Sequence, residues 1–267
     1  MLLGKENKLV KEIKAILAGK QKDKFVIEGD VFIREVVGRV NITALVQSED
    51  YAGTIPDTNC PVYTASPQLF KTLTDTQSPQ GILAVCDKPA VDVSALTPTG
   101  SPLRPTVSII LDNIQDPGNL GTMIRTAVCF GVEVIYLSTG CVDLYNPKVL
   151  RSTAGASFKL PIVQHIDTAT LIPELQAQGI QVLATTPHTD STHYDIDMSA
   201  PVAIIMGNEA NGLSDRIQGL CDKRIKIPIK NLESLNVGVA CGIILCELAN
   251  RVGASDVAVS AQVETLY

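Results

Sequence analysis

The sequence contains no tryptophan and few other aromatic residues, with 6 tyrosines and 5 phenylalanines among 267 residues. A broad platform of aromatic side chains that stacks nucleic-acid bases is therefore not expected. Basic residues are outnumbered by acidic ones, 22 against 28, which gives a formal net charge of −6. This balance excludes a protein that binds nucleic acid through an overall positive charge, and it leaves room only for a local basic patch.

An apolar segment long enough to cross a membrane is also missing. Residues 237–246 form the most apolar stretch, which has about half the length that a bilayer requires. The first residues lack the apolar core of a secretory signal. We therefore expect a soluble, cytoplasmic protein with no membrane partner.

Cysteine and histidine patterns give no sign of a metal site. The 7 cysteines include no Cys-x-x-Cys pair, so neither a zinc ribbon nor a thioredoxin-type site is expected. Their odd number fits reduced and mostly buried thiols. His188 and His193 lack the helical spacing of zinc ligands, and we place them in a surface loop.

Several nucleotide-binding and catalytic motifs are absent. No Gly-x-Gly-x-x-Gly follows an expected strand, and neither the P-loop pattern nor Gly-x-Ser-x-Gly is present. These absences argue against a dinucleotide-dependent oxidoreductase, against P-loop phosphate chemistry and against a serine hydrolase with a nucleophile elbow.

A proline-rich segment divides the chain into two predicted domains. Residues 97–105 contain three prolines and one glycine, which neither a helix nor a central strand tolerates. We place a linker at residues 98–105, between a small α/β domain (residues 1–97) and a larger domain (residues 106–267). In the small domain, short apolar runs predict strands near residues 25–27, 42–46, 61–63 and 82–86, with helical patterns near 30–39 and 66–75.

The start of the chain predicts an amphipathic helix, since apolar residues recur at helical spacing over residues 9–17. Lysines lie on its other flank, at positions Lys5, Lys8, Lys11 and Lys14. They form either a solvated face or an arm that contacts phosphates.

The larger domain alternates between apolar strands and helical patterns. Strands are predicted at residues 106–111, 133–137, 181–185 and 201–206, and a further strand ends at Ile227-Pro228. Helical patterns cover residues 119–130, 146–154, 168–178, 213–220 and 234–251. This alternation predicts an α/β fold with a parallel sheet that has helices on both faces.

Three polar clusters each follow a predicted strand of the larger domain, where open parallel sheets bind ligands. In the first, Asn119 is a good helix cap, and Gly121 and Arg125 lie opposite the apolar stripe. In the second, Gly207 lets a ligand approach the backbone, and Glu209 follows. In the third, Ser234 or Asn236 caps a long apolar helix. Taken singly, each cluster also fits an ordinary capped helix or polar turn.

Together, the three clusters resemble the three motifs of the SpoU (TrmH) family of RNA 2′-O-ribose methyltransferases. In this sequence they read Asn119-x-Gly121-x3-Arg125, Gly207-Asn208-Glu209-x2-Gly212, and Ile227-Pro228 followed by Ser234-Leu235-Asn236-Val237. Lys148-Val-Leu-Arg-x-Thr-Ala-Gly-Ala156, Leu160-Pro161 and Ser78-Pro-Gln-Gly-Ile82 are similar to the family as well. Residues 25–29 resemble its small RNA-binding domain of ribosomal-protein type.

The resemblance implies a trefoil knot in the C-terminal sheet, a pocket for S-adenosylmethionine and a homodimer with residues of both subunits in each active site. It also implies which residues line the cofactor pocket: Thr185, Met206, Gly207, Ile227, Ser234 and Leu235. Two positions depart from the family pattern, Gly238 in place of a serine and Cys246 in place of an aromatic residue, and both concern helix packing.

By the same resemblance, the catalytic residues are Arg125, Asn119, Glu209, Ser234 and Asn236. An arginine is in effect always charged, which argues against a role as a base. Two roles nevertheless stay open for Arg125. Its guanidinium either binds the target phosphate and stabilises a developing alkoxide, or it loses a proton transiently in a desolvated site. Glu209 is a weak base, so we expect it to position Asn119 or Arg125, while Ser234 and Asn236 orient ribose and cofactor.

The function implied is methyl transfer from S-adenosylmethionine to a ribose 2′-hydroxyl of RNA, with ribosomal RNA favoured. The alternatives are a tRNA 2′-O-methyltransferase and a catalytically silent RNA-binding or ribosome-assembly factor. A basic cluster fits an RNA partner and predicts salt-dependent binding: Arg216, Lys223, Arg224, Lys226 and Lys230.

Overall fold

The structure is a computed structural model that describes residues 1–89 and 106–253. The predicted linker, residues 98–105, lies outside the described residues, so that boundary stays a prediction. Contacts divide the described chain into two compact units, of which the first contains residues 1–89 together with 143–159. The second contains residues 106–142 and 160–253. The segment 143–159, which the sequence places in the larger domain, therefore belongs to the first unit.

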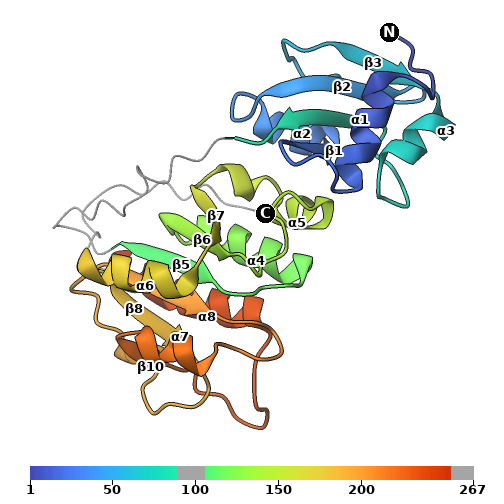
Figure 1. Ribbon diagram of the computed structural model, residues 1–267. Coiled ribbons are helices and arrows are strands. Elements are labelled where there is room, and N and C mark those ends of the chain that lie inside the picture. Colours follow the sequence, from blue (N-terminus) through green and yellow to red (C-terminus); the bar gives the residue numbers. More distant parts are fainter. Residues whose placement is uncertain (90–105, 254–267) are drawn as a thin grey trace. The chain divides into compact units, whose positions relative to one another are not determined.

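The first unit has a four-stranded sheet in the order β1–β4–β2–β3 (Figure 1). Its strands are β1 (Lys24–Glu28), β2 (Ile42–Ser48), β3 (Val62–Ala65) and β4 (Ile82–Asp87). Strand β4 runs antiparallel to both of its neighbours, and β2 and β3 are parallel. The four strands predicted for the small domain are all present.

Short helices pack on this sheet: α1 (Lys8–Leu17), α2 (Asp30–Val36), α3 (Pro67–Phe70) and the 3₁₀ turn η1 (Lys71–Leu73). Helix α1 is capped by Asn7, whose side chain accepts a hydrogen bond from the N–H of Leu9. Val10 and Ile13 are buried against the sheet. The predicted lysines of this segment are all exposed.

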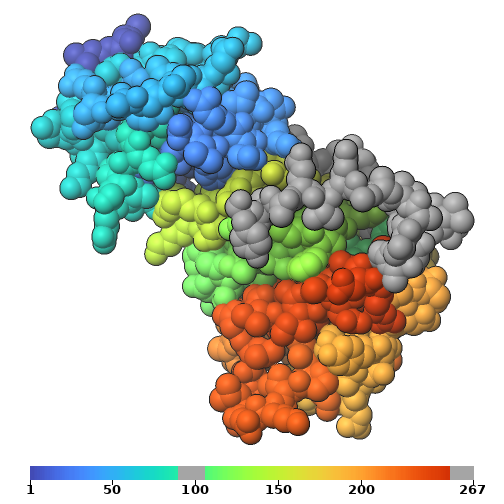
Figure 2. Space-filling model, turned by 180° about the vertical axis from the view of Figure 1, so that it is seen from behind, coloured from blue at the N-terminus to red at the C-terminus, as the bar shows by residue number. Residues whose placement is uncertain are grey.

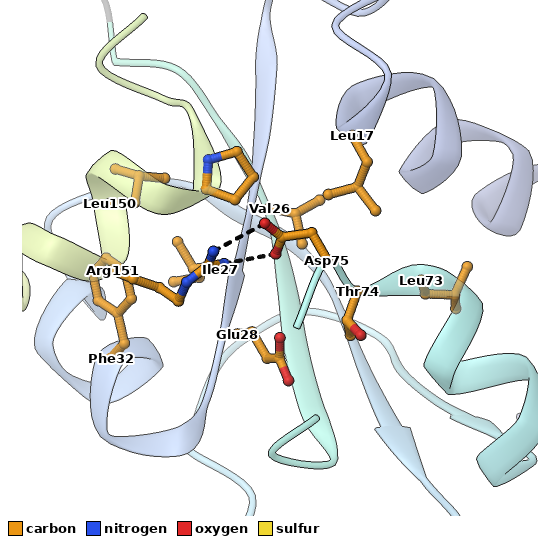
Figure 3. A pocket seen from close by; sticks show the side chains of 11 residues that line it. Leu17, Val26, Ile27, Glu28, Phe32, Leu73, Thr74, Asp75, Leu150 and Arg151 are labelled. Carbon is orange, nitrogen blue, oxygen red and sulfur yellow. Dashed lines mark hydrogen bonds and ion pairs between the residues drawn. The ribbon is translucent and has the colours of Figure 1, made fainter. Parts of the chain in front are cut away.

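Helix α5 (Pro147–Thr153) and the 3₁₀ turn η3 (Ala156–Phe158) complete the first unit. Arg151 forms two hydrogen bonds with the Asp75 carboxylate, at 2.6 and 3.0 Å (Figure 3). The ring of Phe25 contacts Tyr145 and stacks on Phe158, with centroids 4.8 and 5.7 Å apart. These contacts connect residues far apart in sequence, so local periodicity could not reveal them.

The second unit has a six-stranded parallel sheet in the order β10–β8–β9–β5–β6–β7 (Figure 1). Its strands are β5 (Val107–Leu111), β6 (Val134–Ser138), β7 (Ile162–Ile166), β8 (Gln181–Thr185), β9 (Val202–Met206) and β10 (Lys223–Ile225). Strands β5, β6 and β9 are buried along their whole length. The predicted α/β fold with a parallel sheet is confirmed, while the trefoil knot stays a prediction. Strand β10 ends at Ile225, two residues before the predicted Ile227-Pro228.

Helices cover both faces of this sheet. Helix α4 (Pro117–Cys129) packs against α8 (Val237–Gly253), and α6 (Thr168–Ala177) packs against α7 (Asp215–Leu220). Ile110 and Ile205 belong to the cluster that Ile172 of α6 and Ile217 of α7 complete. Because side chains alternate along a strand, the neighbouring buried residues face the opposite helix pair.

All seven cysteines are free thiols, but only Cys86 and Cys241 are fully buried, while Cys129 is exposed. The prediction of mostly buried thiols is therefore wrong, because the other four, Cys60, Cys141, Cys221 and Cys246, are only partly buried. No group of metal-ligating side chains comes together in residues 1–89 or 106–253. Within these same ranges, no helix combines the length and apolarity of a membrane span.

Candidate active site

Three side chains from the three polar clusters form one chain of hydrogen bonds at the carboxyl ends of β5 and β9. The Nδ2 of Asn119 donates to Oε1 of Glu209 at 3.2 Å. The Nδ2 of Asn236 donates to Oδ1 of Asn119 at 2.9 Å. Residues 90 or more positions apart thus meet at a single place on the sheet edge.

Glu209 is a fixed acceptor in this chain. Besides Asn119, its carboxylate accepts hydrogen bonds from the backbone N–H groups of Asp116, at 3.0 Å, and Gln115, at 3.2 Å. Partial burial alone would raise the pKa of Glu209, but these hydrogen bonds outweigh burial and hold the pKa below its usual value. Of the two predicted partners of Glu209, the structure assigns Asn119 and not Arg125.

Asn119 lies inside helix α4 and does not cap it. The helix begins at Pro117, and the Asp116 side chain caps it by accepting the N–H of Asn119 at 2.8 Å. The prediction of Asn119 as the cap is wrong, because an aspartate followed by proline starts the helix two residues earlier. As a result, both polar atoms of the Asn119 side chain are available for Glu209 and Asn236.

Arg125 stands apart from the chain of hydrogen bonds. It is exposed and lies six residues after Asn119, about 9 Å further along the helix axis. Within residues 1–89 and 106–253, no hydrogen bond or ion pair involves its side chain. Gly121, which we place beside Arg125 on the polar side, is instead buried with the apolar stripe.

Gly207 is needed by the backbone of its own loop. A Cβ atom at this position would lie 2.5 Å from the carbonyl carbon of Gly212 and 2.6 Å from the nitrogen of Leu213. The loop closes on itself because Asn208 and Gly212 exchange backbone hydrogen bonds, at 3.2 and 2.9 Å. From the sequence, we expect glycine at position 207 because a ligand approaches the backbone there. The structure shows that glycine is already required because two backbone segments come close together.

Asn236 caps helix α8, as the sequence predicts for Ser234 or Asn236. Its Oδ1 accepts the N–H groups of Gly238 and Val239, at 2.9 and 3.2 Å. Its Nδ2 simultaneously donates to Asn119. One amide therefore ties the start of α8 to the first turn of α4.

A cavity of about 320 Å³ lies beside this chain of hydrogen bonds. All six residues predicted to line a cofactor pocket do line it: Thr185, Met206, Gly207, Ile227, Ser234 and Leu235. Glu209 lines it as well, whereas Asn119, Arg125 and Asn236 do not. Its mixed lining of apolar side chains, loop backbone and few polar groups suits a small organic ligand of mixed character.

The cavity is also lined by polar residues that the sequence did not assign to it: Thr186, His188, Asn211, Gln218, Glu233 and Lys226, the last of which was predicted only for RNA binding. His188 follows β8 closely, so the rule that ligands bind at strand ends could have pointed to it. His193 is not in a surface loop as predicted. It is 2% exposed, and its backbone N–H donates to the carbonyl of Lys226 at 2.9 Å, because the turn η4 (His193–Asp195) docks onto the segment after β10.

Comparison with known proteins gives consistent results. Residues 106–246 match the SpoU rRNA Methylase family. The 23S rRNA (guanosine(2553)-2′-O)-methyltransferase RlmP of Bacillus subtilis is 32% identical over 249 residues, which are 91% of this chain and 96% of the relative.

Two solved structures are similar along nearly their whole length. The SpoU methyltransferase AviRb from Streptomyces viridochromogenes, in complex with AdoMet, has a TM-score of 0.81 and 25% identity, covering 92% of this chain and 98% of its own. The AdoMet-bound rRNA methyltransferase from Sinorhizobium meliloti has a TM-score of 0.80 and 28% identity, covering 94% and 97%. With the family match over more than half of its residues, this chain belongs to the SpoU rRNA methylase family.

Proposed function

We propose that this chain transfers a methyl group from S-adenosylmethionine to the 2′-hydroxyl of a ribose in ribosomal RNA, with a guanosine of 23S rRNA as the target. The observation that carries the proposal is the chain Asn236–Asn119–Glu209 beside a cavity lined by the six predicted cofactor residues. The relative from Bacillus subtilis is named a 23S rRNA guanosine 2′-O-methyltransferase, which supports the choice of RNA and nucleotide.

The cavity fits S-adenosylmethionine by its chemistry. Met206, Ile227 and Leu235 offer apolar surface to an adenosine, and the loop that starts at Gly207 offers backbone polar groups. The Thr185 hydroxyl already donates to the carbonyl of Ile205 at 2.8 Å, so its remaining contribution is as an acceptor. When bound, this cofactor supplies an electrophilic methyl group on a sulfonium centre.

Asn119, Glu209 and Asn236 act together as a positioning group. Glu209 accepts on both carboxylate oxygens, which fixes the amide of Asn119. Ser234 is exposed and lines the cavity, so its hydroxyl is free to orient the ribose. Holding the 2′-hydroxyl in line with the methyl group supplies a large part of the rate enhancement in such a transfer.

Arg125 binds the phosphate of the target nucleotide and stabilises charge that develops on the ribose oxygen. Its exposed side chain has no acidic partner in the described parts of the chain, which supports this role. A solvated guanidinium gives no support to the alternative, in which Arg125 loses a proton in a desolvated site.

The active protein is a homodimer. Helix α8 presents Val239 and Ile243, one turn apart, with 53% and 37% of their surface exposed. Figure 2 shows this helix, in red, at the surface of the molecule. A second copy that covers this face would remove apolar surface from water. Residues of that copy would also complete the active site, in which Arg125 is separated from the hydrogen-bonded Asn119, Glu209 and Asn236 of its own chain.

An rRNA substrate also supports the cytoplasmic location expected from the sequence. Two alternatives remain. A tRNA methyltransferase would methylate tRNA instead of rRNA, and a silent RNA-binding or assembly factor would methylate no RNA.

The test is transfer of labelled methyl from S-adenosylmethionine to 23S rRNA, 16S rRNA and tRNA by the purified protein. We expect label on the ribose of 23S rRNA, and we expect Arg125→Ala to lose at least about 100-fold in turnover because it removes charge stabilisation at the reacting oxygen. Calorimetry should show that this variant still binds S-adenosylmethionine. Label on tRNA alone would support the first alternative, no label on any RNA the second, and near-normal turnover of Arg125→Ala would remove that residue from the mechanism.

A further inference from the structure

Asp112 is a buried carboxylate that has no role in the proposed methyl transfer. It follows β5 directly and is 7% exposed, and it is the only buried aspartate or glutamate in the described ranges 1–89 and 106–253. Its backbone N–H donates to the carbonyl of Met206 at 2.9 Å. The residue therefore stands where the central strands β5 and β9 end, next to the cofactor cavity.

Both oxygens of Asp112 accept hydrogen bonds from neighbouring side chains. The Thr168 hydroxyl donates to Oδ1 at 2.6 Å, and Nδ2 of Asn113 donates to Oδ2 at 3.1 Å. Thr168 is the first residue of α6, so the positive end of a helix dipole adds to the stabilisation of the charge. No cationic side chain pairs with Asp112 in the portion of the chain that the structure covers.

Asn113, the partner of Oδ2, is held in an uncommon conformation. Its φ of +57° is in the left-handed region, which asparagine tolerates better than most residues. Its backbone N–H donates to the Ser138 hydroxyl at 2.9 Å. Its side chain also occupies the space where a Cβ of Gly140 would be.

From Asn113 the hydrogen bonds continue into the site. The carbonyl of Asn113 accepts Nδ2 of Asn208 at 2.9 Å. Asn208 in turn accepts the N–H groups of Ala210 and Asn211, both at 3.0 Å, and so fixes the loop that carries Glu209. Glu209 then holds Asn119.

We infer that Asp112 is a positioning residue for methyl transfer, which acts through Asn113 and Asn208 on Glu209 and Asn119. This inference rests on the proposed function. A buried carboxylate without a cation stabilises a fold poorly, and groups of this kind persist where a fixed geometry is required. Replacing Asp112 should therefore affect turnover more than it affects folding or cofactor binding.

The first experiment compares Asp112→Asn with wild type in the 23S rRNA methylation assay. The amide keeps the size of the side chain, but one of its two ends no longer accepts a hydrogen bond. We expect kcat to fall about 10- to 100-fold because Glu209 and Asn119 shift, with less than about a twofold change in the affinity for S-adenosylmethionine. The matched control is Ser108→Ala, a buried hydroxyl on the same strand β5, which should leave kcat unchanged.

A double variant separates positioning from a general structural role. In the Asn119→Ala background, Asp112→Asn should reduce kcat by no more than about twofold further, because both residues act in one network. If Asp112→Asn does not fold, Thr168→Val removes one of the two donors and should give a smaller loss in the same direction.

Three results would overturn the inference while leaving the proposed function intact: an active wild type with an equally active Asp112→Asn, full multiplication of the two effects in the double variant, or loss of cofactor binding together with turnover. Inactivity of the wild type on every RNA would instead contradict the proposed function.

Discussion

At the scale of single residues, the glycines and amides of the loops determine the shape of the site. Position 207 has no room for a Cβ, because the backbone of Gly212 and Leu213 returns to within contact distance of it. Asn208 holds the turn with two backbone hydrogen bonds. The Gly207-Asn208 pair is therefore needed for the loop to fold, in addition to any role in binding.

Gly207→Ala tests this requirement. The added methyl group meets backbone atoms that cannot rotate away, so we expect a loss of about 1–3 kcal/mol in unfolding free energy and weaker binding of S-adenosylmethionine. Urea unfolding and calorimetry measure the two effects. Gly219→Ala is the control, because its Cβ would have no neighbour within 4 Å and lies in helix α7. It should leave stability unchanged or raise it by up to about 1 kcal/mol, and an equal loss in both variants would contradict the account.

Sequence reasoning identified the residue types of the site but not their individual contacts. The six cavity residues were predicted through the resemblance to the SpoU family. The role of Asp116 as the cap of α4 and the burial of His193 were not, because both depend on how one loop packs on another.

At the scale of elements, the packing of α4 against α8 brings the first and third motifs together. Asn236 has two roles at this junction, since its oxygen caps α8 and its nitrogen donates to Asn119. Small residues allow the close packing: a Cβ at Gly238 would be 3.5 Å from the side chain of Thr122, and one at Gly242 would be 3.7 Å from that of Thr126.

Two substitutions of Asn236 separate these roles. Asn236→Asp keeps the capping oxygen and favours the helix dipole, so stability should stay within about 0.5 kcal/mol of wild type. It cannot donate to Asn119, so turnover should fall about tenfold or more. Asn236→Ala should lose turnover and also about 0.5–2 kcal/mol of stability.

Urea unfolding and the methylation assay measure both quantities for these variants. The control is Ser66→Ala, which removes the cap of α3 and should lower stability without lowering turnover. Normal turnover of Asn236→Asp would show that the bond to Asn119 has no function.

The strand that the sequence did not predict, β7, has a weak apolar pattern. Strand β7 is at the edge of the sheet and only its first two residues are buried, and His165 within it has a φ of +60°. Strand β10, which is only three residues long, was predicted, but it ends two residues before the predicted Ile227-Pro228. The buried central strands, in contrast, were predicted to within one residue of their bounds, because continuous apolar runs are the signature of a parallel sheet.

At the scale of the whole molecule, the assignment of residues 143–159 is the part of the architecture that sequence reasoning could not provide. The ion pair between Asp75 and Arg151 and the rings around Phe25 are long-range contacts. An apolar pattern predicts that a helix forms, as it does at α5, but it contains no information about which unit the helix joins.

The proposed homodimer is also tested at this scale. Wild type should have the mass of two 28.5 kDa chains by sedimentation. Val239→Lys should dissociate it, because burying a lysine without a partner costs several kcal/mol. Val31→Lys is the matched control, since Val31 is also an exposed valine on a helix, and it should leave the mass unchanged. A monomeric wild type, or a dimer that tolerates Val239→Lys, would place the interface elsewhere or exclude it.

The proposed function is methylation of one ribose in 23S rRNA at the site where β5 and β9 end. Its most direct test is a map of 2′-O-methylation across the ribosomal RNA of cells that have or lack the gene. We predict that one 23S rRNA position loses its methyl group and that wild type restores it but Arg125→Ala does not. An unchanged map, or full restoration by Arg125→Ala, would contradict the account.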